Sequence, residues 1–344
     1  MKRIAIVWPG FTGYMDACWR ELAKKHQVKI YIEPSWFEQD FDGSELAGLD
    51  WRRVERREDD AHFSETIEDI RQFLPDAVLL CGWSTPLSQS VAAADVSGVK
   101  ILAFDMPWEW SFRKIAARWA LIPKLRNFKA AFVPGTRALR YANWLGFVGR
   151  VATGSNPSGW ERFCDIRPSD SGFLFVGRLS PEKRLDLLVA AYGKYRRQVS
   201  NPWRLDIVGG GNGDRPQVDG VTYFGFTRPN EIGGLLAGHA ALVLPSRQET
   251  WGICAMEAMS AGLMTIVSDA CGLTADVEPT VKFTSGDVDG LCQAMVKVHQ
   301  MSKDDCEKAG KKGRRQAERY SAFHWVERLE GLIEKTEILR NKEI

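Results

Sequence analysis

Residues 245–262, PSRQETWGICAMEAMSAG, determine the fold that we predict for the second half of the chain. They follow an apolar run, 240–244, that is typical of a buried parallel strand. Ile253–Ala261 has the composition of a helix, and the glycine after it is in the position of a helix stop. On one continuous helix Glu249 and Glu257 would point about 80° apart. We therefore expect Glu249 on a strand-to-helix loop and Glu257 in an early turn of the helix.

The loop that this pattern predicts is suited to bind a phosphate group. It directs backbone N–H groups and the positive end of the helix dipole toward one point. Two carboxylates beside such a site are unusual unless they accept hydrogen bonds from hydroxyl groups. A sugar nucleotide carries hydroxyls on both sides of its diphosphate. We expect the diphosphate at the N–H groups of four consecutive residues: Thr250, Trp251, Gly252 and Ile253.

A second motif, FVGRLSPEK at 175–183, begins in a predicted strand and ends in a predicted helix with Pro181 at its first position. Lys183 and Arg184 would then lie in the first turn, where cations oppose the helix dipole. An anion is therefore expected nearby, and we expect Arg178 and Lys183 to converge on a diphosphate. The alternative is that these cations pair with two neighbouring carboxylates, Glu182 and Asp186.

Together the two motifs resemble those of retaining glycosyltransferases of the GT4 type, which carry a Glu-x7-Glu signature and a phosphate-binding segment similar to 175–183. The resemblance extends over nearly the whole second half of the chain. The first half matches only in its rhythm of strands and helices. The resemblance implies an α/β fold of the GT-B kind, in which two Rossmann-like β/α/β domains face each other across a cleft.

The resemblance also implies a reaction, the transfer of a sugar from a nucleotide-diphosphate donor to a glycan, lipid-linked or small-molecule acceptor with retention of anomeric configuration. Glu249 would bind hydroxyls of the transferred sugar, and Glu257 those of the ribose. Arg178 and Lys183 would stabilise the departing diphosphate, so that neither a metal ion nor a cofactor is expected. Two other interpretations stay open: a sugar-nucleotide epimerase or phosphorylase of similar fold, and a non-catalytic protein that binds sugar nucleotides or glycans.

The first half begins with a strand-loop-helix-strand pattern of the Rossmann type. An apolar run, 4–8, leads into a glycine loop, 9–13, that is not a complete GxGxxG motif. In the related family this loop approaches the donor diphosphate, which makes Gly10 and Gly13 candidate contacts. The alternative is a plain glycine turn. Residues 38–63 are acidic and are predicted to be irregular.

Asp105 follows a predicted strand, 99–104, and ligands of parallel sheets bind beyond the carboxyl ends of the strands. Many members of the related family carry a His near this point that touches the transferred sugar, whereas this chain reads FDMPWEW. Either Asp105 or Glu109 takes over that role, or the role is absent. The alternative for Asp105 is a turn or cap residue.

Two further loops of the second half are candidate donor contacts. Gly209 opens a glycine-rich segment, 209–213, that lets the backbone approach a ligand closely, although a plain turn has the same composition. A predicted strand, 221–226, ends where the related family holds the nucleotide base, which makes Phe226 a candidate. The next loop, with two glycines in the family, reads Cys271-Gly272 here.

Residues 108–129, WEWSFRKIAARWALIPKLRNFK, combine apolar residues at helical spacing with six basic residues. One interpretation is an amphipathic helix that packs on the sheet and exposes a solvated basic face. The other is an acceptor-side patch that contacts an anionic membrane surface or a lipid-linked acceptor.

The totals limit the class of protein. The net charge of +2 argues against nucleic acid as a general partner, and the five His residues lack metal-site spacing. Seven cysteines without a Cys-x-x-Cys pair favour free thiols in a reducing compartment. We see neither a signal peptide nor a run of 18 apolar residues. We therefore expect a cytoplasmic protein, with peripheral contact at the inner membrane surface as an option.

The domain boundaries are predicted from one break in the rhythm of strands and helices, within the Asn-, Pro-, Ser- and Gly-containing segment 155–170. We expect an acceptor-binding domain over 1–156 and a donor-binding domain over 157–320. A terminal helix within 321–344 is expected to pack back toward the first domain.

Overall fold

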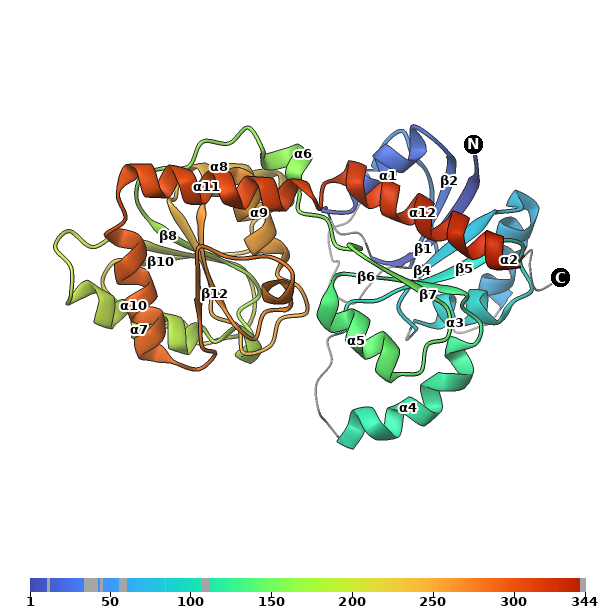
Figure 1. The fold of residues 1–344 in the computed structure, drawn as a ribbon, viewed down its shortest axis with the longest axis horizontal. Helices are drawn as coiled ribbons and strands as arrows, with labels where there is room; N and C mark the ends of the chain where they lie inside the picture. The colour runs from blue at the N-terminus through green and yellow to red at the C-terminus, as the bar shows by residue number, and fades with distance from the viewer. Residues whose placement is uncertain are drawn as a thin grey trace. The chain divides into compact units, whose positions relative to one another are not determined.

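The computed structural model of the chain describes residues 1–10, 13–33, 43, 46–55, 61–83, 85–106 and 112–340. The chain divides into two compact units. Unit 1 comprises Met1–Asn156 and Ala322–Ile344, and unit 2 comprises Pro157–Ser321. Each unit contains one parallel β-sheet covered by helices (Figure 1). The predicted pair of Rossmann-like α/β domains is therefore confirmed.

The sheet of unit 1 has seven parallel strands in the order β3-β2-β1-β4-β5-β6-β7. Its strands are β1 (Arg3–Pro9), β2 (Gln27–Glu33), β3 (Asp50–Arg53), β4 (Ala77–Cys81), β5 (Val99–Ala103), β6 (Ala130–Val133) and β7 (Arg150–Thr153). The helices are α1 (Asp16–Ala23), α2 (Ala61–Phe73), α3 (Pro86–Ala93), α4 (Phe112–Leu125), α5 (Thr136–Trp144) and α12 (Ala322–Arg340). The prediction of an irregular segment over 38–63 is wrong at β3, a polar strand at the edge of the sheet.

One face of this sheet is covered by α1 and α12, which lie side by side (Figure 1). The central strands are apolar throughout, because both faces of the sheet are covered. Alternate residues of each strand pack into the core on one face or the core on the other. Trp325 of α12 is 1% exposed, and its indole Nε1 donates to the carbonyl of Ser155 at 2.8 Å. Residues at the end of the sequence thus complete the core that residues at its beginning start.

The sheet of unit 2 has six parallel strands in the order β10-β9-β8-β11-β12-β13. Its strands are β8 (Phe173–Val176), β9 (Leu205–Val208), β10 (Val221–Phe224), β11 (Ala241–Leu244), β12 (Met264–Ser268) and β13 (Val281–Phe283). The α-helices are α6 (Trp160–Phe163), α7 (Leu185–Arg196), α8 (Ile232–Ala237), α9 (Ile253–Ala261), α10 (Val288–His299) and α11 (Lys303–Glu318), with 3₁₀ turns that include η2 (Pro181–Lys183).

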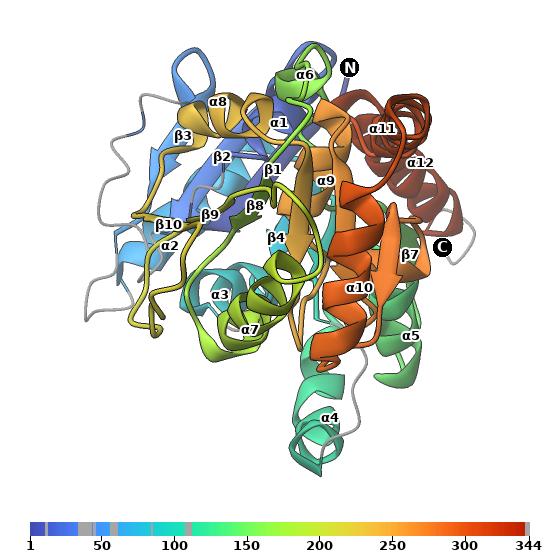
Figure 2. The same cartoon turned by 90° about the vertical axis from the view of Figure 1, so that its left-hand side faces the viewer.

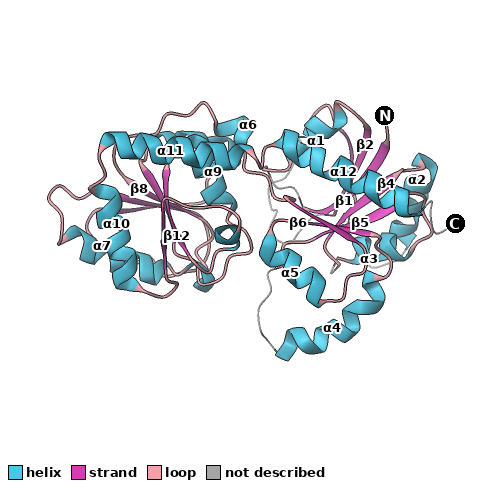
Figure 3. Ribbon diagram, viewed as in Figure 1, coloured by secondary structure: helices cyan, strands magenta, loops and turns pink. Residues whose placement is uncertain are grey.

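The helices of unit 2 form a layer on each side of the sheet (Figures 1 and 3). The pair α7 and α10 packs on one face, and α9 with α8 packs on the other (Figure 2). The strand order reverses between β8 and β11. Parallel sheets bind ligands beyond the carboxyl ends of the strands at such a reversal. A binding site is therefore expected in the loops after β8 and β11.

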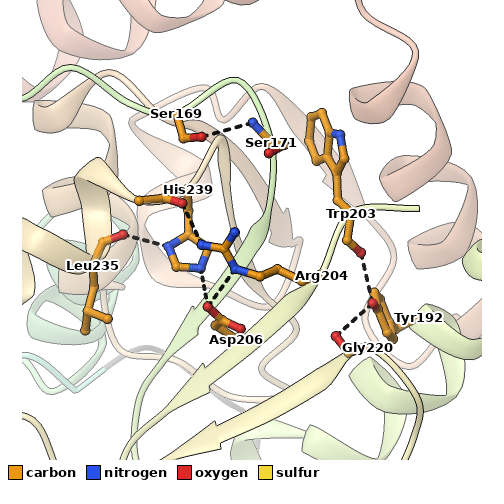
Figure 4. A network of polar contacts seen from close by, with 10 residues as sticks. Ser169, Ser171, Tyr192, Trp203, Arg204, Asp206, Gly220, Leu235 and His239 are labelled. Carbon is orange, nitrogen blue, oxygen red and sulfur yellow. Dashed lines mark hydrogen bonds and ion pairs between the residues drawn. The ribbon is translucent and has the colours of Figure 1, made fainter. Parts of the chain in front are cut away.

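At the amino ends of the strands of this sheet, a buried polar network joins β9 to the segment between α8 and β11 (Figure 4). His239 is 2% exposed, and its Nε2 lies 2.9 Å from Asp206 Oδ2 while its Nδ1 lies 2.7 Å from the carbonyl of Leu235. Each ring nitrogen of His239 therefore faces an oxygen that can accept a hydrogen bond. Arg204 donates to the same Asp206 oxygen at 3.0 Å.

Candidate functional site

The loops after β8 and β11 meet at the reversal of strand order in unit 2. The backbone N–H of Arg247 donates to the carbonyl of Glu182 at 2.8 Å, which joins the two loops. Lys183 of the first loop forms an ion pair with Glu249 of the second. Their side chains are only 14% and 13% exposed. The two sequence motifs thus contribute one acid and one base to a single small site.

The ion pair sets the protonation state of Lys183. Burial, the largest single effect, disfavours the charged ammonium group. Attraction to the Glu249 carboxylate and the hydrogen bond between them outweigh burial, so the pKa of Lys183 is raised. Lys183 therefore stays charged at neutral pH, and a second anion in this site would compete with Glu249 for it.

The helix after Glu249 begins and ends where the sequence predicts, with α9 at Ile253–Ala261 and glycines at both caps. Gly252 is the N-cap at φ 107°, and a Cβ there would lie 2.7 Å from Cys271 Sγ. The conformation and the crowding both require glycine. The first N–H groups of α9 have no carbonyl partner inside the helix, as at every helix N-terminus. Cys254 in this first turn is close enough to Lys183 and Glu249 for both charges to act on its thiol.

The loop 249–251 is held in place by the segment after β12. Gly272 N–H donates to the carbonyl of Glu249 at 3.0 Å, and Leu273 N–H donates to that of Trp251 at 2.9 Å. A Cβ on Gly272 would lie 1.9 Å from the carbonyl oxygen of Thr250. Gly272 is therefore the glycine that the close approach of the Thr250 carbonyl requires. The side chain of the preceding residue, Cys271, is buried.

Glu257 lies on α9, one turn beyond its first residues and half-buried. Burial raises the pKa of Glu257 to about 7, and the nearby Arg162 guanidinium lowers it only in part. A Cβ added to Gly159 would lie 3.3 Å from Glu257 Cγ, so the start of α6 forms one wall of its surroundings. Glu257 is therefore poised to accept or lose a proton near neutral pH.

Cys254 is a residue of this site that the sequence analysis missed. It is close enough to Lys183, Glu249 and Glu257 for all three to affect its pKa, which burial raises to about 12. Its thiol is therefore protonated and unreactive at neutral pH. The signal was present in the sequence, because Cys254 and Glu257 are three residues apart on one helix and share a face.

Arg178 lies just after β8, and its side chain is 65% exposed, 3.8 Å from Glu182. Of the two alternatives for this residue, the described contact is the pairing with Glu182. The prediction of a helix from Pro181 is wrong, because Pro181–Lys183 is a 3₁₀ turn and α7 begins at Leu185. Arg184 between them has φ 54° and binds Asp186 at 2.9 Å. Convergence of Arg178 and Lys183 on a diphosphate stays a prediction.

The glycine segment 209–213 packs on the loop after β8. A Cβ on Gly209 would lie 1.8 Å from the carbonyl oxygen of Gly177, so this glycine admits the neighbouring backbone. Phe226, beyond the end of β10, is 76% exposed. An open aromatic ring at this edge is compatible with a nucleotide base, and the contacts of Gly209 and Phe226 with a donor stay predictions.

The side chain and the backbone of Trp251 have different roles in the candidate site. The ring is 1% exposed and packs on Tyr320, with ring centroids 5.2 Å apart. Only the backbone N–H of Trp251 is therefore a candidate contact for a donor, together with those of Thr250, Gly252 and Ile253. Donor binding by these groups stays a prediction.

The remaining candidates belong to unit 1. Gly10 follows β1 with φ 78°, and its N–H donates to the carbonyl of Glu33 at 2.8 Å. Gly13 lies in the turn before α1. Asp105 is exposed two residues after β5, and its charge adds to burial in raising the pKa of Cys81 at the end of β4. Glu109 lies outside the described residues.

The basic segment is helical over α4, and the structure describes the side chains of only part of it. Trp119 is 74% exposed, and the guanidinium of Arg118 lies 5.4 Å from the ring centre of Trp144. Val148, after α5, is 96% exposed. Residues 108–111 lie outside the described residues, as do the side chains of Arg113 and Lys114.

Two kinds of feature are absent from the described residues. No group of three or more His, Cys, Asp or Glu side chains is arranged there to hold a metal ion. No helix in the same part of the chain has both the length and the apolar composition needed to cross a bilayer. The absence of a metal requirement stays a prediction.

Comparison with known proteins gives related sequences for parts of the chain. Residues 170–301 match the family described as Glycosyl transferases group 1. A D-inositol 3-phosphate glycosyltransferase of Nocardia farcinica is 25% identical over 193 residues, which are 49% of this chain and 41% of that protein. The chain therefore spans less than half of the length of this relative.

Solved structures match over nearly the whole chain. A sucrose-phosphate synthase of Thermosynechococcus elongatus has a TM-score of 0.73 at 17% identity, over 98% of this chain and 100% of that one. Anabaena HepE, solved in complex with UDP, has a TM-score of 0.74 at 13% identity, over 97% and 100%. These likenesses establish the fold. Residues 170–301 thus match the glycosyl transferases group 1 family, within a chain that has the GT-B fold.

Proposed function

We propose that this protein is a glycosyltransferase that takes a sugar from a nucleotide-diphosphate donor bound in unit 2. The observation that carries the proposal is the Lys183–Glu249 pair beside the N-terminus of α9, at the reversal of strand order. The site combines a buried cation, a helix dipole and a hydroxyl-accepting carboxylate. The cation and the helix dipole are suited to a diphosphate, and the carboxylate is suited to sugar hydroxyls. The Anabaena relative in fold was solved with UDP, which supports a nucleotide as ligand.

In the proposed reaction the bond between the anomeric carbon and the diphosphate breaks, and negative charge grows on the leaving group. Lys183 would exchange Glu249 for a phosphate oxygen, and the N–H groups at 250–253 would bind the same charge. Arg178 is exposed and would reach the diphosphate from the loop after β8. Fixed donors of this kind stabilise the transition state because they need no reorganisation.

Glu249, released from Lys183, would accept hydrogen bonds from hydroxyls of the transferred sugar. Glu257, on the next turn of α9, would accept them from the ribose. We propose retention of anomeric configuration through attack on the same face, in which the leaving phosphate helps to deprotonate the acceptor. Because the cations are supplied by the protein, we also propose that no divalent metal is required.

A panel of nucleotide sugars tests the proposal. The protein is incubated with UDP-, GDP- and ADP-sugars, and release of the nucleotide is measured with and without a panel of acceptors. Transfer to an acceptor supports a glycosyltransferase. Conversion of the donor sugar without any acceptor would identify an epimerase instead. Binding without turnover would identify a non-catalytic protein, and no interaction with any donor would exclude all three.

Two variants and one control connect this activity to the site. Glu249→Ala and Arg178→Ala are each expected to lower kcat/KM by about 100-fold or more. Arg184→Ala is the matched control, because its guanidinium is turned away to Asp186 and lies next in sequence to Lys183. Wild-type turnover in either site variant would refute the role assigned to that residue.

We further propose that the acceptor side of the protein contacts an anionic surface, a membrane or a lipid-linked acceptor. The support is a charge pattern. Residues 110–160 contain no Asp or Glu, although the whole chain has a net charge of only +2. In the same stretch there are nine basic residues: Arg113, Lys114, Arg118, Lys124, Arg126, Lys129, Arg137, Arg140 and Arg150. The exposed Trp119 and Val148 add apolar groups that would enter the interface.

A further inference from the structure

The chain passes between the two units at two points, after Asn156 and after Ser321. The parts of unit 2 that lead to these points are residues 157–160 and residues 318–321, named here the crossing segments. The N–H of Ser158 in the first segment donates to the carbonyl of Tyr320 in the second at 2.9 Å. Within unit 2 the two crossing segments are therefore bonded to each other.

The second crossing segment contacts the loop of the proposed donor site. The ring of Trp251 packs on that of Tyr320, with centroids 5.2 Å apart and an angle of 50° between the planes. Trp251 is 1% exposed and belongs to the apolar core of this layer. Its backbone lies between Glu249 and the first turn of α9, so the same residue carries a candidate donor contact and the anchor of the segment.

The first crossing segment contacts α9 itself. The hydroxyl of Ser260, one turn beyond Glu257, donates to the carbonyl of Ser158 at 3.0 Å. Gly159 has φ 69°, and a Cβ there would lie 3.3 Å from Glu257 Cγ. The space beside Glu257 is therefore filled by the backbone of the crossing segment, and a movement of α9 would displace that segment.

Two buried polar atoms at this junction, Trp251 Nε1 and Ser158 Oγ, have no hydrogen-bond partner among the residues that the structure describes. Buried donors without a partner are unfavourable, and native structures rarely contain them without a reason. Trp251 and Ser158 are thus held at this junction by packing and by backbone contacts, and their polar side-chain atoms contribute no hydrogen bond to the described residues there.

We propose that occupancy of the donor site is transmitted to both crossing segments, through Trp251 to the second and through Ser260 and Glu257 to the first. A diphosphate bound to Lys183 and to the N–H groups at 250–253 fixes the loop. Fixing the loop restricts Trp251, and through it Tyr320. The inference rests on the proposed function, because it takes a nucleotide as the ligand. Trp251, Ser260 and Tyr320 are positioning residues.

Hydrogen exchange read by mass spectrometry tests this transmission. UDP, GDP and ADP are first titrated by calorimetry, and the tightest binder is used at saturation with the full-length protein. Exchange of peptides that cover 157–160 and 318–321 is expected to slow by about fivefold or more, the lower end of ordinary coupling between sites. A nucleotide that binds without slowing these peptides would overturn the proposal. If none of the three nucleotides binds, the proposed function fails and this proposal fails with it.

Two variants separate the two routes, and a third is a control. Tyr320→Ala removes the ring under Trp251 and is expected to abolish the slowing at 318–321 while nucleotide still binds. Ser260→Ala is expected to reduce the slowing at 157–160 and to leave that at 318–321. Trp203→Ala removes a half-buried ring at the amino ends of the strands of the same sheet and is expected to behave as wild type. Full slowing in both Tyr320→Ala and Ser260→Ala would refute the routes.

Discussion

Glu257 contributes to the pH dependence of the stability of unit 2 near neutral pH. Burial raises the pKa of Glu257 from 4.5 to about 7 in the folded protein, so the folded state holds this proton more tightly than the unfolded state. The stabilisation is complete below the unfolded pKa and is lost as the pH rises through the folded one. Glu257→Gln keeps the shape and removes the charge, so its advantage over wild type grows with pH.

We therefore expect the free energy of unfolding of Glu257→Gln to gain on wild type by about 1–2 kcal/mol between about pH 5 and about pH 8, a value reduced for the partial exposure of the side chain. Urea denaturation at several pH values, followed by circular dichroism, measures the difference. A difference that is constant over this range, or that shrinks with rising pH, would contradict burial as the cause.

The buried pair of His239 and Asp206 supports a second prediction for single residues. His239→Leu leaves the Asp206 carboxylate buried with a lost partner, and we expect it to lower the free energy of unfolding by about 3–5 kcal/mol. The double variant Asp206→Leu/His239→Leu removes both polar side chains and is expected to recover part of that loss. Because this pair lies at the amino ends of the strands and the candidate site lies beyond their carboxyl ends, nucleotide affinity of the folded variants is expected to stay the same. A double variant less stable than His239→Leu would refute the assigned pairing.

At this scale the sequence predicted the residues of the candidate site better than it predicted the contacts between them. Lys183 and Glu249 were each chosen from a separate motif, and the structure joins them although 66 positions separate them. No local pattern determines that contact, because it depends on which strands are neighbours in the sheet. Cys254 was missed for the opposite reason, since its signal was local but a lone cysteine on a helix resembles any small apolar residue.

Among the elements, the loop after β9 is adapted to hold the loop after β8. Gly209 faces the carbonyl of Gly177 and has φ 148°, whereas a Cβ on the adjacent Gly210 would meet only Phe226 Cβ at an ordinary 3.7 Å. Gly209→Ala must displace the loop that carries Arg178. We expect it to lower the free energy of unfolding by about 1–3 kcal/mol and to weaken nucleotide binding.

Gly210→Ala is the matched control for this prediction and is expected to stay within about 0.5 kcal/mol of wild type. Chemical denaturation and calorimetric titration with nucleotide give both quantities for both variants. Equal losses of stability and of nucleotide binding in the two variants would contradict the prediction. They would show that the loss of glycine flexibility, and not a clash with the carbonyl of Gly177, causes the effect.

The elements themselves were predictable where hydrophobic pattern and capping agree. The helix Ile253–Ala261 was predicted to the residue, because glycines mark both of its ends. The helix expected from Pro181 was not, since the αL conformation of Arg184 interrupts the turn before α7 begins. The strand β3, DWRR, lies at a sheet edge and has no alternating apolar pattern to reveal it.

At the scale of the whole molecule, the uneven distribution of charge leads to a prediction about surfaces. Lys124, Arg126 and Lys129 are exposed at the end of α4 and before β6. Replacing all three by Gln is expected to weaken binding to vesicles of phosphatidylcholine and phosphatidylglycerol by about 100-fold, because each basic residue near such a surface contributes about 1 kcal/mol. Cosedimentation over a range of salt concentrations measures the binding.

The control removes the same charge from unit 2. Lys303, Lys308 and Lys311 are exposed on α11, which also carries acidic residues, and their replacement by Gln is expected to leave vesicle binding unchanged. Binding that is equally weakened by both triple variants would reflect net charge alone. Unchanged binding in the α4 variant would rule out this surface as the contact.

The fold of the whole chain was predictable because each half repeats strands and helices in an order that only a parallel sheet accommodates. The proposed reaction, acceptor and membrane contact depend on side chains that bind other molecules. Those molecules are not part of the chain, so the pattern of strands and helices does not predict them. Asp105 illustrates this limit, because its place after β5 is fixed by the fold and its role is not.

The composition of unit 1 has a consequence for the order of events during synthesis. The ribosome completes Met1–Asn156 first, yet the apolar face beside α1 stays open until Trp325, Leu329 and Ile333 of α12 emerge, after all of Pro157–Ser321. The domain that is translated first is therefore the last to close. Until then the nascent protein exposes an apolar surface of the kind that chaperones bind.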